Sequence, residues 1–279
     1  MLVPLTERLA IAIANDAIGE RLWFYTNYHC NLSCTYCLTS SSPKAKKREL
    51  NVATIRAIAQ DAVRLGFRAF GVTGGEPFMR RDMPELVAEL GHYLPTIVLT
   101  NGTLFTERFV SERLTQLASL PVALQLSIDS AYPDEHDRFR GSGSHDAALS
   151  ALVRLHAHGI RARVGTTRDD EEDVAAAASL RQLVARYGVT GNDHVVRPIV
   201  ARGAAVVAKL GIPAGPEDVP AELTITIDGA FWSPASPTVR SGRLDTRERV
   251  SRVITPLDVA VDAMLRYGNE VTERTKRVA

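Results

Sequence analysis

Cysteine is almost absent from this chain, because its 279 residues include only three and all three lie within residues 30–37. Three neighbouring thiols pair badly, which argues against a framework of disulfides. Neither sign of charge dominates, since 33 Lys and Arg face 32 Asp and Glu, so there is no electrostatic case for nucleic acid. Long apolar runs are missing too, and none reaches the roughly 20 residues of a membrane-spanning helix. We therefore expect no nucleic-acid or membrane partner, and a cytoplasmic location where thiols stay reduced.

The three cysteines follow the spacing C-x-x-x-C-x-x-C at Cys30, Cys34 and Cys37. Thiolates with this spacing on a short loop can bind three corners of a cuboidal iron–sulfur cluster, whereas a [4Fe–4S] cluster has four irons. One iron would then stay open for a small molecule. A structural zinc site is the alternative, but its fourth ligand would have to be His29, which lies directly against Cys30 in a strained spacing.

Predicted strands and helices alternate along most of the chain. Parallel strands need crossovers of about a dozen residues, which these helices supply, and the right-handed crossover rule curves such a series into a barrel. We therefore predict an α/β fold, a partial (β/α)6 TIM-like barrel. The strands are expected at residues 22–27, 68–73, 96–100, 122–129, 161–167 and 195–199, and the helices at 52–65, 82–92, 106–118, 145–158 and 171–187.

Both ends of the chain break this alternation. Near the C-terminus, two short apolar runs flank the Asp228-Gly229 turn, which predicts a β-hairpin, and residues 256–266 are expected to form a closing helix. We divide the chain into an N-terminal lead-in helix at residues 1–20, the barrel at residues 21–203, and a C-terminal extension of β-hairpin and helix at residues 204–279.

Polar and glycine-rich motifs follow several of the predicted strands. They are the cysteine loop, Gly74-Gly75-Glu76-Pro77, Thr100-Asn101-Gly102 and Ser127-Ile128-Asp129. Because the carboxyl ends of parallel strands meet at one rim, these distant segments should gather there. Taken singly, the glycine motif also fits an ordinary turn, and Asp129 also fits a cap on the turn that follows it.

Taken together, these motifs resemble those of the radical S-adenosylmethionine superfamily over about residues 20–200. The resemblance implies two cofactors, a [4Fe–4S] cluster and S-adenosyl-L-methionine, with the cluster bound by the three cysteines. It also implies a reducing partner such as flavodoxin or ferredoxin. In that family, one electron from the cluster cleaves the sulfonium, and the resulting 5′-deoxyadenosyl radical takes hydrogen from the substrate. The cofactor contacts expected on this basis are Tyr36, Gly74, Gly75, Glu76, Pro77, Thr100, Asn101, Ser127 and Asp129.

Two arginines on the last two strands extend this set. A buried guanidinium needs an anionic or dipolar partner, which for Arg163 and Arg197 would be the cofactor carboxylate or an acidic group on the substrate. A structural ion pair is the alternative for each arginine. Period-two alternation places Gln125 on the inner face of its strand, deeper than Ser127, so Gln125 and Tyr25 are candidates for substrate contact.

The function we expect from the sequence is hydrogen abstraction from a small polar metabolite, by epimerisation, dehydrogenation or rearrangement. The C-terminal extension resembles the start of a module that carries further clusters in relatives, but it has Ser233-Pro234-Ala235 where they have a cysteine. A second cluster is therefore not expected. The alternatives are a peptide maturase or glycyl-radical activating enzyme that acts on a protein, and a noncatalytic iron–sulfur protein.

Overall fold

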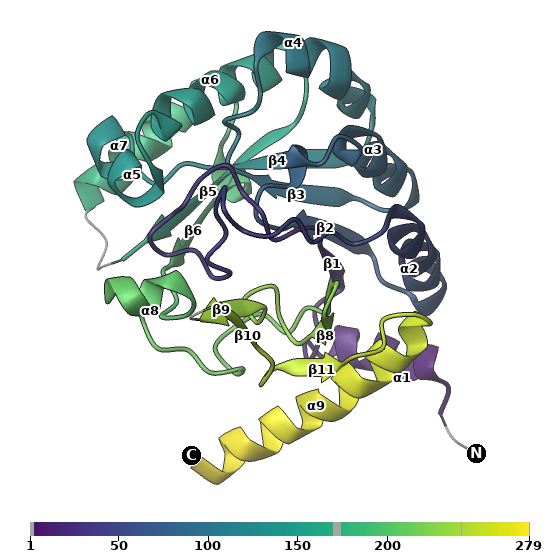
Figure 1. Ribbon diagram of the computed structural model, residues 1–279. Coiled ribbons are helices and arrows are strands. Elements are labelled where there is room, and N and C mark those ends of the chain that lie inside the picture. Colours follow the sequence, from purple (N-terminus) through teal and green to yellow (C-terminus); the bar gives the residue numbers. More distant parts are fainter. Residues whose placement is uncertain (1–2, 170–173, 241, 279) are drawn as a thin grey trace.

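The computed structural model describes residues 3–169, 174–240 and 242–278. Its main feature is a curved nine-stranded sheet in the order β11-β8-β7-β1-β2-β3-β4-β5-β6, with helices on its outer face (Figure 1). Strands β6 and β11 are the two edges of this sheet, so the barrel is open. Within the described residues, no helix has both the length and the apolar character needed to cross a membrane.

The first six strands run parallel and follow one another in sequence order, as expected. Each crossover carries helical structure that covers the outer face of the sheet (Figure 1). The strands are β1 (Arg21–Tyr25), β2 (Ala69–Thr73), β3 (Thr96–Thr100), β4 (Val122–Ser127), β5 (Ala162–Arg168) and β6 (His194–Pro198). The helices are α1 (Leu5–Ala14), α2 (Val52–Leu65), α3 (Met83–Tyr93), α4 (Glu107–Phe109), α5 (Pro133–Arg140), α6 (Ser144–Ala157) and α7 (Val174–Ala185).

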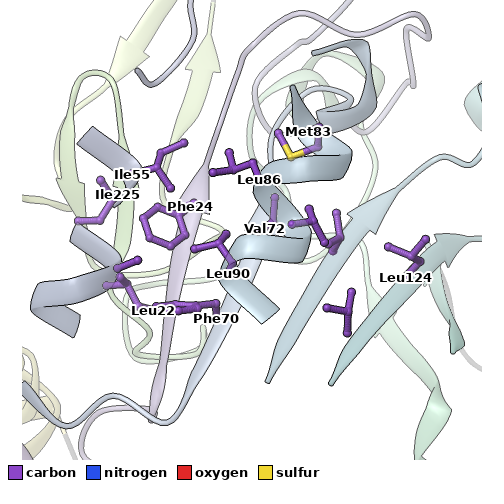
Figure 2. Packing of buried hydrophobic residues seen from close by; sticks show 14 of the residues in the cluster. Leu22, Phe24, Ile55, Phe70, Val72, Met83, Leu86, Leu90, Leu124 and Ile225 are labelled. Carbon is purple, nitrogen blue, oxygen red and sulfur yellow. The ribbon is translucent and has the colours of Figure 1, made fainter. Parts of the chain in front are cut away.

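Helix α2 shows how local sequence sets an element and its packing. The side chain of Asn51 accepts a hydrogen bond from the backbone of Ala53 at the start, and Gly66 ends the helix with a left-handed φ of 101°. Apolar side chains such as Ile55 then pack on the outward residues of β1 and β2, Phe24 and Phe70 among them (Figure 2). This buried layer leaves the inner face of the sheet for function.

The C-terminal extension continues the same sheet beyond β1. Strand β7 (Thr224–Thr226) pairs parallel with β1, and β8 (Gly229–Phe231) returns antiparallel to β7, which is the hairpin that the sequence predicts. Strand β11 (Arg249–Ser251) adds to β8. The remaining elements are α8 (Ala204–Ala208), the two-stranded sheet of β9 (Thr238–Arg240) and β10 (Arg243–Asp245), and α9 (Leu257–Val278).

The structure confirms the predicted fold class and departs from it in detail. The expected helix at 106–118 is three short pieces, α4, η2 (Val110–Leu114) and η3 (Thr115–Ser119). Helix α5 was not predicted, and α9 is longer than the expected 256–266. The start of the expected helix at 171–187 lies outside the described residues.

Candidate functional site

A cavity of about 530 Å³ opens where the parallel strands end at their carboxyl termini. Pockets of this size are typical of small-ligand and cofactor sites. The cavity is lined by residues from the cysteine loop, from the carboxyl ends of β2, β3 and β4, and from β5 and β6. Segments far apart in the sequence therefore share one space, as the parallel topology predicts. Among the expected site residues, those that line it are Cys30, Cys34, Cys37, Tyr25, Tyr36, Gly74, Gly75, Thr100, Asn101, Ser127 and Arg197.

The three cysteines are free thiols at this cavity. Burial raises the pKa of Cys30 to about 12. Burial also raises the pKa of Cys34 to about 11, although the positive charge of Arg140 opposes that rise. A thiolate at these positions therefore needs a cationic partner, and the irons of a cluster would supply one.

Hydrogen bonds order the end of the cysteine loop and connect it to Tyr25 on β1. The hydroxyls of Tyr25 and Thr39 lie 2.8 Å apart, and the Thr39 hydroxyl lies 3.7 Å from Cys37 Sγ. The backbone N–H of Ser41 donates to the same sulfur at 3.3 Å. Burial raises the pKa of Tyr25 well above its usual value, so the phenol stays protonated. Tyr25 thus lines the cavity beside a cysteine.

The glycine pair after β2 packs directly against the chain that leads into the cysteine loop. A Cβ at position 75 would lie 2.1 Å from the carbonyl oxygen of His29, a distance that real Cβ atoms do not reach. The N–H of Gly75 donates to the carbonyl of Asn27 at 2.7 Å, and the N–H of Glu76 donates to that of His29 at 3.0 Å. The absent side chain lets these two loops come together, and it also leaves backbone at the cavity wall.

Glu76 holds three segments together from behind the cavity wall. Its carboxylate accepts hydrogen bonds from the Thr100 hydroxyl at 2.8 Å, from the backbone of Phe78 at 3.0 Å and from the backbone of Asn101 at 2.8 Å. Burial raises its pKa to about 7, and those three hydrogen bonds oppose the rise. Neither Glu76 nor Pro77 borders the cavity, and a cofactor contact at either residue stays a prediction.

Asn101 fixes the first cysteine from the neighbouring strand end. Its side-chain amide donates to Asn31 Oδ1 at 2.9 Å and lies 3.7 Å from Cys30 Sγ. Asn101 Oδ1 in turn accepts from the backbone and hydroxyl of Thr103. The motif after β3 therefore positions the cysteine loop and also lines the cavity.

Asp129 forms a buried ion pair with Arg140, the last residue of α5. Arg140 Nε donates to Asp129 Oδ2 at 2.6 Å, and the Tyr36 hydroxyl donates to the same oxygen at 2.6 Å. Burial opposes ionisation of Asp129, but Arg140 outweighs it and holds the pKa of the carboxyl below its usual value. Asp129 does not border the cavity, whereas Arg140 and Tyr36 do.

The inner face of β4 carries two further expected residues. Ser127 lines the cavity, whereas Gln125 lies deeper on the same face and does not border it. The Gln125 side chain covers Gly165 on β5, where a Cβ would meet Nε2 at 2.5 Å. Its Oε1 is buried and has no hydrogen-bond partner among the described residues.

The two arginines expected at the site separate in the structure. Arg163 donates to the carbonyl of Asn192 at 2.6 Å and pairs with Asp193 at 3.5 Å, away from the cavity. This arginine lies near the amino end of β5, and a cofactor contact at Arg163 stays a prediction. Arg197 does line the cavity.

The geometry favours a cluster over the zinc alternative. His29 Nε2 lies 3.5 Å from Glu49 Oε1, and His29 does not border the cavity with the cysteines. Within the described ranges, no three His, Cys, Asp or Glu side chains are grouped closely enough to hold a single metal ion. A cuboidal cluster has another requirement, since its thiolates bind separate corners. Three free thiols at one cavity fit that requirement.

Sequence reasoning missed Arg140 and Asn27. Arg140 was findable, because residues 133–140 begin with a proline, carry two acids in the first turn and end with arginines, which is a helix signature. Asn27 offers no such signal, although its amide joins the carbonyls of His29 and Glu76 at 2.9 and 3.0 Å.

The chain is similar to known proteins in both sequence and structure. The profile of the Radical SAM superfamily matches residues 24–180. Mycofactocin maturase MftC of Mycobacterium tuberculosis (strain ATCC 25618 / H37Rv) is 36% identical over 188 residues, covering 66% of this chain and 46% of that protein. PqqA peptide cyclase of Xanthomonas axonopodis pv. citri (strain 306) is 33% identical over 133 residues, covering 46% and 34%. The crystal structure of Streptococcus suis SuiB bound to precursor peptide SuiA has a TM-score of 0.65 at 15% identity, covering 94% and 70%.

These relatives overturn our expectation of a small-molecule substrate. One is a maturase, another is a peptide cyclase, and SuiB was crystallised with a precursor peptide. Our expectation did not rest on any feature of the cavity. The chain spans about half the length of the curated relatives it matches.

Proposed function

This chain belongs to the radical S-adenosylmethionine superfamily, and from that premise we propose that it modifies a peptide by removing a hydrogen atom from carbon. It is an enzyme whose cofactors are a [4Fe–4S] cluster and S-adenosylmethionine. The observation that carries the peptide substrate is the similarity to MftC over 188 residues and to PqqA peptide cyclase over 133 residues.

The residues around the cavity divide into ligands and supports. When bound, the two cofactors supply the one-electron chemistry that removes a hydrogen atom from carbon. We assign Cys30, Cys34 and Cys37 to three irons, which leaves the fourth iron for S-adenosylmethionine. Arg140 and Ser127 line the cavity near these thiols and are assigned to the polar groups of S-adenosylmethionine.

The supporting residues orient this set through hydrogen bonds. Asp129 holds the guanidinium of Arg140 by two hydrogen bonds, at 2.6 and 3.2 Å. Glu76 and Asn101 hold the loops after β2 and β3 against the cysteine loop. Their buried hydrogen bonds keep the cavity in shape before any ligand binds.

The direct test measures which molecules stimulate cofactor cleavage. The reduced holoenzyme is given S-adenosylmethionine together with either a peptide fraction or a small-metabolite fraction of one cell extract, and 5′-deoxyadenosine is quantified. We expect the peptide fraction to raise 5′-deoxyadenosine above the background without substrate. Stimulation by the metabolite fraction alone would contradict the proposal.

The product then identifies the reaction. In deuterated water, a peptide that loses two mass units has been dehydrogenated, whereas a peptide that gains deuterium at carbon has been quenched by an exchangeable donor. Either product supports hydrogen abstraction from a peptide. An unchanged peptide, recovered while 5′-deoxyadenosine accumulates, would contradict it.

A further inference from the structure

Arg197 is a cavity-lining arginine that the protein itself leaves without a partner. Its register partner on β5 is Thr167, which also lines the cavity, so both side chains lie on the inner face of the sheet. Among the described residues, Arg197 has no hydrogen bond and no ion pair. A guanidinium presents five N–H donors, and in the exposed Arg197 all of them are available to a ligand in the cavity.

Glu222, the acid whose charge acts on Arg197, is already hydrogen-bonded to other side chains. Glu222 accepts a hydrogen bond from the indole of Trp23 at 2.6 Å and one from Arg21 at 3.3 Å. Burial lowers the pKa of Arg197, Glu222 opposes this, and the charges of Arg163 and Arg21 lower it further. Arg197 is exposed, and its side chain borders the cavity. An anion entering the cavity would therefore meet an unneutralised charge.

The other charged groups that line the cavity do not compete for this role. Arg140 is neutralised by Asp129 at 2.6 Å. Asp218 is exposed and accepts a hydrogen bond from the backbone of Gly215 at 2.8 Å. Arg21 also lines the cavity and pairs with Glu222 at 3.3 Å. Arg197 is thus the cation of the described cavity wall that has no ion pair of its own.

An aromatic surface lies in the same cavity. Trp23 on β1 also lines it, and its ring covers β2 so closely that a Cβ on Gly71 would lie 2.3 Å from the ring. The hydrogen bond to Glu222 fixes the indole. The cavity therefore offers a fixed apolar surface and a free guanidinium, a combination that suits a carboxylate carried on an apolar peptide segment.

We propose that Arg197 binds a carboxylate of the peptide substrate, either the C-terminal carboxylate or the side chain of an aspartate or glutamate. The inference rests on the proposed function, because it names a feature of the peptide that enters the cavity. The planar guanidinium pairs with a carboxylate through two parallel hydrogen bonds, which fix orientation as well as position. Since the cysteines line the same cavity, this contact would set which peptide carbon faces the cofactors.

The test measures binding without turnover. Three mixtures of N-acetylated synthetic hexapeptides are prepared: free C-terminal acids without Asp or Glu, C-terminal amides with one Asp or Glu, and C-terminal amides without any acid. Each mixture is dialysed anaerobically against the cluster-loaded enzyme with S-adenosylmethionine bound. We expect one acidic mixture to be retained about 10-fold or more over the neutral one. The retained mixture identifies which carboxylate is bound.

The variants assign this preference to one side chain. In R197Q the preference should disappear, whereas in R161Q it should persist, because Arg161 is an exposed arginine that pairs with Asp193 outside the cavity. Equal retention of all three mixtures by the wild type would overturn the inference, as would an undiminished preference in R197Q. If R197Q fails to take up iron, R197K decides: a weaker preference supports the inference and an undiminished one overturns it, since lysine lacks the planar fork.

The two proposals can fail separately. A preference for carboxylates with no hydrogen abstraction from any peptide would remove the proposed function while leaving the assignment of Arg197 in place. Turnover of neutral peptides without any carboxylate preference would leave the proposed function in place and remove the assignment of Arg197.

Discussion

The side chains nearest the cysteines are held by buried polar contacts. Asp129 and Arg140 are 5% and 9% exposed, and they meet at 2.6 Å beside the phenol of Tyr36. Removing one partner of such a pair leaves the other as an uncompensated charge in a dry environment, which is far more costly than losing a surface pair. The position of Arg140 at the cavity thus depends on a residue that does not touch the cavity.

Replacing Asp129 by alanine should lower the free energy of unfolding by about 3 to 5 kcal/mol, because the guanidinium of Arg140 loses its buried counter-charge. Denaturant unfolding measures this change. The matched control is E112A, which breaks the exposed Arg108–Glu112 pair and should cost less than about 1 kcal/mol. Equal losses in the two variants would show that the Asp129 pair is no more than a surface contact.

His136 gives a pH dependence of stability. It is fully buried, and its Nδ1 accepts the backbone N–H of Asp129 at 3.1 Å. Burial and the charge of Arg140 lower its pKa to about 4, whereas an unfolded histidine has a pKa of about 6.5. Between these values the unfolded chain binds more protons, so the contribution is complete above about pH 6.5 and is lost as the pH falls towards 4.

The expected slope from this group approaches about 1.4 kcal/mol per pH unit. Asparagine at position 136 retains an acceptor but does not titrate. The difference in unfolding free energy between wild type and H136N should therefore shrink as the pH falls from 6.5 to 4.5. A difference that stays constant over this interval would refute the buried neutral imidazole.

Among the elements, the C-terminal extension is part of the main sheet, and the loop after β2 packs against the cysteine loop. The β7–β8 hairpin extends the sheet from the β1 edge, and Ile225 belongs to the same buried cluster as Phe24 and Phe70 (Figure 2). Just after the carboxyl end of β1, the chain that leads into the cysteine loop contacts the glycine pair that follows β2. Each contact makes one element depend on another that is distant in sequence.

Two isoleucines of the hairpin test whether it stabilises the barrel. Ile225 is fully buried, whereas Ile227 is 41% exposed. Truncation of Ile225 to alanine should cost about 2 to 5 kcal/mol of unfolding free energy, because it leaves a cavity in the core. The same change at Ile227 should cost less than about 1 kcal/mol. A single unfolding transition is expected for both variants, and a small cost at Ile225 would mean that the hairpin is only loosely attached.

Alanine at position 75 should disturb the cysteine loop. Its Cβ would collide with the backbone carbonyl of His29, so either the loop after β2 or the cysteine loop must move. We expect G75A to retain less than half of the iron of the wild type after anaerobic reconstitution. G268A is the control, because its Cβ in α9 would approach only the ring of Trp232, at 3.2 Å. Normal iron content in G75A would show that this close approach is not needed for the cluster.

For the molecule as a whole, the sequence was most informative about the repeating strands and about the three cysteines, which are the only ones in the chain. Alternating apolar runs predicted the parallel strands, and the cysteine spacing predicted the thiols that meet at the cavity. The roles of Glu76, Asp129 and Arg163 were not predictable in the same way, since each depends on at least one partner that is 11 or more residues distant in sequence. A carboxylate next to a motif looks identical whether it faces a ligand or a neighbouring loop.

The same limit applies to the substrate. We expected a small molecule from the sequence, whereas the maturase and the peptide cyclase among the relatives favour a peptide. Specificity lies in the shape and charge of the cavity, where Arg197 and Trp23 come from strands that are neighbours neither in the sequence nor in the sheet. Only the folded arrangement shows that these two side chains share one space.

The central claim is that three thiolates hold a cluster whose remaining iron binds S-adenosylmethionine. The most direct measurement is the electron paramagnetic resonance spectrum of the reduced, reconstituted enzyme, recorded with and without S-adenosylmethionine on samples of known iron and sulfide content. We expect about four irons and four sulfides per chain and a spectrum that changes when S-adenosylmethionine is added. A spectrum that S-adenosylmethionine leaves unchanged, or zinc in place of iron, would contradict it.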